Sequence, residues 1–126
     1  MTSLEAFVRH ARAAQAAWGG TSRHARRYLL QAWIRHYREA AAELAALIME
    51  ETGKPITLAR GEVGRGITTL EATVEAIASH GDEVVPYDLM PGAEGVRARL
   101  RRFPKGVVLA ITPFNFPVNL ALHKLG

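Results

Sequence analysis

The sequence contains no cysteine, and aromatic residues make up only 7% of its 126 residues. Without cysteine, these residues hold no disulfide, no thiolate metal site and no cysteine nucleophile. No apolar run approaches the roughly 18–20 residues that a membrane span requires. The amino terminus lacks the basic start and apolar stretch of a secretory signal. We therefore expect a cytoplasmic protein with no membrane partner and no metal site.

Neither sign of charge dominates, because 16 Lys and Arg residues face 12 Asp and Glu residues and leave a net charge of +4. Hydrophobic residues account for 48% of the chain, which excludes a disordered tail. A chain of this length is typical of one domain and can bury a modest core.

Apolar residues recur at helical spacing through the first two thirds of the chain. The first helix is predicted over about 3–18, with Thr2 and Glu5 spaced as a capping box. A second helix is predicted to begin after Ser22, with a break near 37–40, and to end at Gly53. A third is predicted over about 56–79.

Three glycines, at positions 61, 64 and 66, lie inside the third helical pattern. Their spacing matches a loose phosphate-binding pattern, but a dinucleotide loop follows a strand and this run follows a helix. We therefore expect small residues at a place where another helix packs closely.

The pattern changes after Gly81, where residues 83–87 and 96–103 read as two short strands separated by turn residues. Residues 107–111 form a continuous apolar run, which is typical of a strand covered on both faces. Pro117 is suited to open a final helix through residue 126. A doubly covered strand needs neighbours, so the sequence indicates the N-terminal part of a larger α/β protein or one half of an obligate assembly.

Four arginines of the second strand region could form a nucleic-acid stripe. No aromatic residue interleaves with them, so a solvated strand face or intersubunit ion pairs are favoured, with Asp82, Glu83 and Asp88 as candidate partners. The four are Arg97, Arg99, Arg101 and Arg102.

The run Ile111-Thr112-Pro113-Phe114-Asn115-Phe116-Pro117 resembles the strand-turn motif of the aldehyde dehydrogenase superfamily. Further segments resemble that family in the same order and spacing, so that the resemblance covers roughly residues 20–126. The motif and the run at 91–95 lean towards lactaldehyde or semialdehyde dehydrogenases. The further segments are 51–55, 59–63, 102–108, 118–120 and 123–126.

The resemblance implies an α/β fold in which this chain supplies several helices, a projecting β-hairpin and the first strand of a Rossmann-like parallel sheet. Residues 1–82 would be the helical part of a nucleotide-binding domain, and 83–104 the oligomerisation hairpin. Residues 105–126 would be the first core strand of the nucleotide-binding domain and the helix that follows this strand. It also implies a homo-oligomer, a dimer or tetramer formed through the hairpin. The family's glutamate base and cysteine nucleophile lie outside these motifs, so the 126 residues alone are expected to be inactive.

The family oxidises an aldehyde to a carboxylic acid through a cysteine thiohemiacetal, with NAD or NADP as cofactor. By resemblance, Asn115 would donate a hydrogen bond to the oxyanion, and it would contact the cofactor together with Ile111, Thr112, Pro113 and Phe114. The alternative for Asn115 is a turn residue that caps the following helix.

Further positions by resemblance are Phe116, Leu120 and His123 in the substrate channel and Lys124 in a proton network. Ordinary packing, a hydrogen-bonding histidine and a solvated lysine are the alternatives. For the whole chain, the alternative function is a truncated, non-catalytic module that adds its hairpin strands to a full-length relative. A basic nucleic-acid-binding domain is the least favoured function, and no nucleic-acid partner is predicted.

Overall fold

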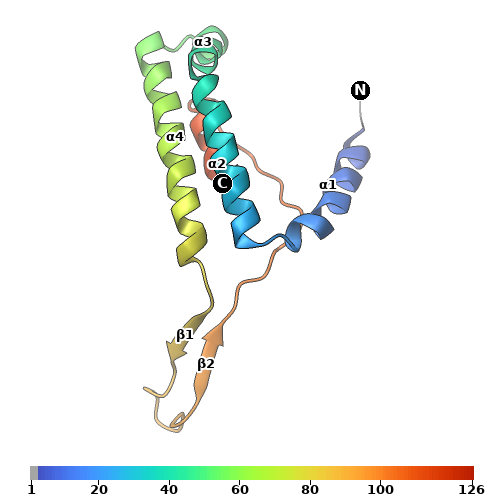
Figure 1. Cartoon of the computed structure of the whole chain (residues 1–126), viewed down its shortest axis with the longest axis vertical. Coiled ribbons are helices and arrows are strands. Elements are labelled where there is room, and N and C mark those ends of the chain that lie inside the picture. The colour runs from blue at the N-terminus through green and yellow to red at the C-terminus, as the bar shows by residue number, and fades with distance from the viewer. Residues whose placement is uncertain (1–2) are drawn as a thin grey trace.

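A computed structural model describes residues 3–126 of the protein. Helices dominate this part of the chain, and one antiparallel hairpin projects from them (Figure 1). No described helix is long and apolar enough to cross a membrane. In chain order the elements are α1 (Leu4–Gly19), α2 (Arg23–Glu39), α3 (Ala41–Thr52), α4 (Ile56–Ser79), β1 (Glu83–Pro86), β2 (Arg97–Leu100) and α5 (Pro117–Leu125).

Helix α4 is the centre of the core, because α2, α3 and α5 all pack against it. Its apolar residues recur every three or four positions, which places them on one buried face. Figure 1 shows α2 beside α4, and α1 pointing away from both. Helix α1 accordingly contains no buried residue. The core residues are Ile34, Tyr37, Ala45, Ile48, Ala59, Val63, Leu70 and Leu122.

The predicted helix boundaries agree closely with the observed ones. The predicted break in the second helix lies at Ala40, between α2 and α3, and α4 spans the predicted residues. Gly53 ends α3 with a φ of 69°, a conformation that glycine adopts without a steric penalty. The predicted cap at Thr2 lies outside the described residues. Within them, the Ser3 side chain caps α1 by accepting a hydrogen bond from the Ala6 amide at 3.3 Å.

The glycine prediction holds at one position of the three. A Cβ atom added at Gly66 would lie 2.3 Å from the Tyr37 hydroxyl and 2.7 Å from Leu122 Cδ1, so helix packing requires glycine there. Gly61 and Gly64 are exposed, and an added Cβ would meet nothing within 4 Å. The prediction of close packing is wrong for these two, because they lie on the outer face of α4.

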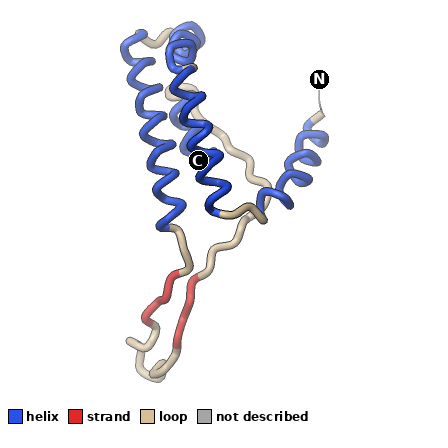
Figure 2. The backbone as a smooth tube through the Cα atoms, in the orientation of Figure 1, coloured by secondary structure: helices blue, strands red, loops and turns tan. Residues whose placement is uncertain are grey.

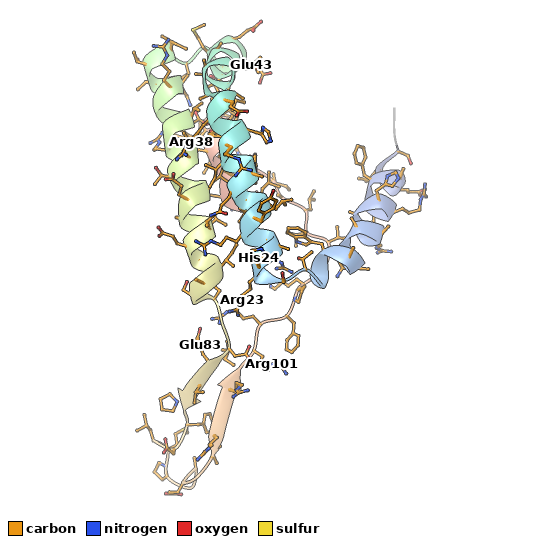
Figure 3. All side chains as sticks on the ribbon, in the orientation of Figure 1. Arg23, His24, Arg38, Glu43, Glu83 and Arg101 are labelled. Atoms are coloured by element: carbon orange, nitrogen blue, oxygen red, sulfur yellow. The ribbon has the colours of Figure 1, made fainter. Side chains whose placement is uncertain are left out.

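The hairpin pairs Glu83 with Leu100 and Pro86 with Arg97, and its strands are shorter than predicted (Figure 2). Two ion pairs within the chain join the two arms of the hairpin at its open end, where Figure 3 labels Glu83 and Arg101, one residue of each pair. Arg101 Nε lies 3.5 Å from Asp82 Oδ2, and Arg102 pairs with Glu83. Two of the three predicted carboxylate partners are therefore confirmed.

Residues 107–111 do not form the predicted strand within this chain. The segment runs from the hairpin back to α5 without ladder hydrogen bonds, and Leu109 is 83% exposed. A strand exists through hydrogen bonds to a neighbour, and the described residues place no second parallel strand beside it. An apolar run of this kind is typical of a covered strand, and the described residues do not cover it. Pro117 opens α5 as predicted.

Candidate functional site

A buried carboxylate holds the amino terminus of α5. Glu62 belongs to the buried face of α4, and its side chain is 0% exposed. Its Oε1 atom accepts hydrogen bonds from the amides of Val118 at 3.0 Å and Asn119 at 3.2 Å. These amides lie in the first turn of α5, where no helical carbonyl is available to accept them. Glu62 therefore caps α5 from another helix, and its negative charge faces the positive end of the helix dipole.

Lys54 connects this carboxylate to the predicted motif. It follows the left-handed Gly53, and its side chain is 14% exposed. The Nζ atom forms an ion pair with Glu62 and donates a hydrogen bond to the Asn115 carbonyl at 2.8 Å. It also lies 4.3 Å from the centroid of the Phe116 ring. The backbone at Asn115 and Phe116 is thus tied to α4 through a charged bridge.

Tyr37 and Arg65 make further contacts beside this network. The Tyr37 hydroxyl donates to the Val63 carbonyl at 3.2 Å. Burial, and then the charge of Glu62, raise the pKa of Tyr37 to about 12. The guanidinium of Arg65 lies 5.0 Å from the centroid of the Phe116 ring, so two cations contact that ring. The site is therefore a buried anion balanced by one cation and by the peptide dipoles of α5.

The predicted cofactor-contacting residues lie on the segment that this bridge holds. Ile111, Pro113 and Phe114 are exposed, and Thr112 is half-buried. The side chain of Asn115 is exposed while its backbone carbonyl is bound by Lys54. Asn115 is not the cap of α5, because Phe116 occupies the N-cap position and Glu62 binds the first-turn amides. The alternative interpretation of Asn115 as a helix cap is wrong.

The remaining predicted residues are distributed along α5. Phe116 and Leu120 are half-buried, whereas His123 and Lys124 are exposed in the last turn. Basic side chains there complement the negative end of the helix dipole. The residue that anchors α5 in the core is Leu122, which carries no predicted role.

Lys54 and Glu62 received no role from the sequence patterns, although both lie in segments that carry the family resemblance. A signal was present, since Glu62 falls at the helical spacing of Ala59, Val63 and Gly66, which are all buried. A carboxylate on an apolar face requires charged or hydrogen-bonding partners. Within residues 3–126, no group of three or more His, Asp and Glu side chains could hold a metal ion.

The profile of the aldehyde dehydrogenase family matches residues 2–126. The chain belongs to this family. It is 38% identical over 104 residues to an aspartate-semialdehyde dehydrogenase of Pseudomonas canavaninivorans, an alignment covering 82% of this chain and 22% of that protein. Its fold matches aldehyde dehydrogenase 21 from Physcomitrella patens in complex with the product succinate, with a TM-score of 0.85 and 31% identity. That match covers 97% of this chain and 25% of the other.

A second structural match is an NADP-dependent glyceraldehyde-3-phosphate dehydrogenase from Bacillus halodurans C-125 complexed with NADP. The TM-score is 0.79 at 37% identity, and the match covers 91% of this chain and 24% of that one. The predicted fold class, the N-terminal part of an aldehyde dehydrogenase fold, is confirmed by these matches. This aldehyde dehydrogenase chain spans about a quarter or less of the length of the relatives that it matches.

Proposed function

We propose that this chain is the N-terminal section of an NAD(P)-dependent aldehyde dehydrogenase that oxidises a small aldehyde to a carboxylic acid. Membership of the family supports the reaction class. The substrate class is supported by the relative named for aspartate semialdehyde, and the cofactor by the match named for NADP.

The segment 111–114 has the chemistry needed to contact a nicotinamide ring. Ile111 and Phe114 present exposed apolar side chains, and the flanking backbone forms no regular ladder. Apolar contact and backbone hydrogen bonds are the usual means by which such sites hold a flat ring. Ile111, Thr112, Pro113 and Phe114 would line the nicotinamide side of the cofactor. When bound, NAD(P) supplies the acceptor for the aldehyde hydride.

Asn115 is proposed as the oxyanion donor. An amide N–H offers partial positive charge without titrating, so it stabilises a developing oxyanion at every pH at which the enzyme works. The observation that carries this role is the bond from Lys54 Nζ to the Asn115 carbonyl, which holds the backbone while leaving the side-chain amide accessible. Phe116, Leu120 and His123 would face the substrate, and Lys124 would join a proton network behind it.

The projecting hairpin is proposed as the oligomerisation element. Both strands are edges of a two-stranded sheet, and Val84 and Leu100 are exposed on them. Unpaired strand edges with apolar side chains are suited to strand addition by a second subunit. These exposed edges support the proposal of a homodimer or homotetramer formed through residues 83–104. Residues 1–82 and 105–126 would contribute to the nucleotide-binding domain.

The test begins with the natural polypeptide, whose intact mass is measured before its activity is assayed with lactaldehyde and with a semialdehyde, using NAD and NADP. We expect a chain several times longer than 126 residues that forms NAD(P)H. Asn115→Ala should lower kcat by about 10²–10³, the usual loss for one oxyanion donor. Gln31→Ala removes an exposed amide from α2 and is the matched control. An active enzyme in which both variants retain the unmodified kcat would refute the role of Asn115.

A further inference from the structure

We infer that Lys54 and Glu62 are positioning residues that set the direction of the Asn115 side chain in the enzyme. This inference rests on the proposed function of Asn115 as oxyanion donor. Neither residue is assigned contact with the reacting atoms. They act through the backbone of the segment that carries Asn115, because one bonds its carbonyl and the other fixes the helix that follows.

A fully buried carboxylate is costly unless charged and hydrogen-bonding groups surround it. Glu62 meets that requirement with one ammonium group and two peptide amides, and together they engage both of its oxygens. An apolar residue would also fill this place on α4, so packing alone does not require a carboxylate there. What the carboxylate adds is a cap for α5, because its hydrogen bonds to the first-turn amides fix the residue at which the helix begins.

Lys54 joins that fixed point to Asn115. An ammonium group has three N–H donors, and here one is directed to Glu62 and another to the Asn115 carbonyl. The Phe116 ring packs against the same cation. Two contacts therefore restrain the backbone at Asn115. Lys54 binds the carbonyl of Asn115 itself, and Glu62 caps the helix that begins two residues later. The backbone position from which its side-chain amide projects is therefore set by Lys54 and Glu62.

The chain offers a matched control for the loss of an ion pair on α4. Arg38 and Glu71 also form an ion pair with one partner on α4, and Figure 3 labels Arg38 on α2. Both side chains are about half exposed, and the pair joins α2 to α4 rather than α4 to the motif. Glu71→Gln therefore removes an interhelix charge pair while leaving the support of Asn115 in place.

The experiment is a double-mutant cycle in the complete aldehyde dehydrogenase that contains this chain. Lys54→Met should lower kcat by about 10²-fold, the loss expected from a small misplacement of a catalytic group. The same substitution in the Asn115→Ala background should cause little further loss, because the misplaced group is already absent. Lys54→Arg should retain most of the activity, because a guanidinium can donate both to the Glu62 carboxylate and to the Asn115 carbonyl oxygen. Glu71→Gln should leave kcat unchanged.

The outcomes separate the two proposals. If Asn115→Ala retains full kcat, the oxyanion role fails and this inference fails with it. If Asn115→Ala is impaired and Lys54→Met is either fully active or equally damaging in both backgrounds, the positioning role alone is refuted. If Lys54→Met does not fold, Glu62→Gln decides in its place, because it keeps an acceptor for the α5 amides and weakens the Lys54 pair. A Glu62→Gln loss that vanishes in the Asn115→Ala background supports the inference, and any other result for that variant overturns it.

Discussion

Among single residues, Tyr37 makes the electrostatics of the buried carboxylate measurable. Its hydroxyl is held near Glu62, and burial together with that charge raises its pKa from 10.0 to about 12. A phenol whose pKa is raised in the folded state favours folding in its neutral form. This contribution is therefore complete below pH 10 and is lost as the pH rises through about 12.

Tyr37→Phe should consequently change the pH dependence of the unfolding free energy. Each pKa unit corresponds to about 1.4 kcal/mol of unfolding free energy. Between pH 10 and 12 the unfolding free energy of the original chain should therefore fall by up to roughly 3 kcal/mol more than that of the variant. At pH 7 the variant should be less stable by about 1 kcal/mol, because the hydrogen bond to Val63 is gone.

Urea unfolding measured from pH 7 to 12 tests both effects. Tyr28→Phe, at an exposed position, is the control. Parallel curves for the original chain and Tyr37→Phe would contradict the shifted pKa.

The same residues show what the sequence reveals of the candidate site and what it does not. Asn115 is recognisable because it lies in a run of seven residues whose order is itself informative. Lys54 and Glu62 are separated from it by 61 and 53 positions, and the contact depends on how α4 and α5 cross. No local pattern encodes that crossing. A buried glutamate on an apolar stripe indicates that a partner exists, but the identity of the partner comes from the fold.

The helices were predictable from sequence because their signals are local. Apolar periodicity, the glycine after α3 and the proline at the start of α5 each act within a few residues of the boundary that they define. The strand at 107–111 was predicted from an apolar run whose meaning depends on neighbours. Without a parallel partner in the described residues, the run stays extended and unpaired.

The glycines of helix α4 lie in different environments, so the same substitution should have opposite effects on stability at two of them. Gly66→Ala should destabilise the chain by roughly 1–3 kcal/mol, because the added Cβ meets the Tyr37 hydroxyl and Leu122. Gly64→Ala, two residues earlier, should stabilise it by up to about 1 kcal/mol through helix propensity alone. Urea unfolding of the two variants provides the measurement. A Gly66→Ala protein as stable as Gly64→Ala would show that the contact between α4, α2 and α5 is looser than described.

For the whole molecule, the distribution of exposed apolar residues distinguishes two parts. The helices α2 to α5 enclose a continuous core, whereas the hairpin and the segment 107–111 leave apolar side chains in solvent. Such a surface is typical of a part that is covered by other chain segments. This asymmetry is consistent with a chain that spans about a quarter of each matched structure.

The purified 126-residue chain should therefore self-associate as its concentration rises, and Leu109→Lys should shift it towards the monomer in sedimentation velocity. An extended segment with apolar side chains and unpaired backbone groups is a template for strand pairing, and a lysine at such an edge opposes that pairing. Leu4→Lys changes a residue of similar exposure on α1, where the backbone is already hydrogen-bonded within the helix. We expect Leu4→Lys to leave strand-mediated association intact. Equal dispersal by both variants would show that general stickiness, rather than pairing along 107–111, drives the association.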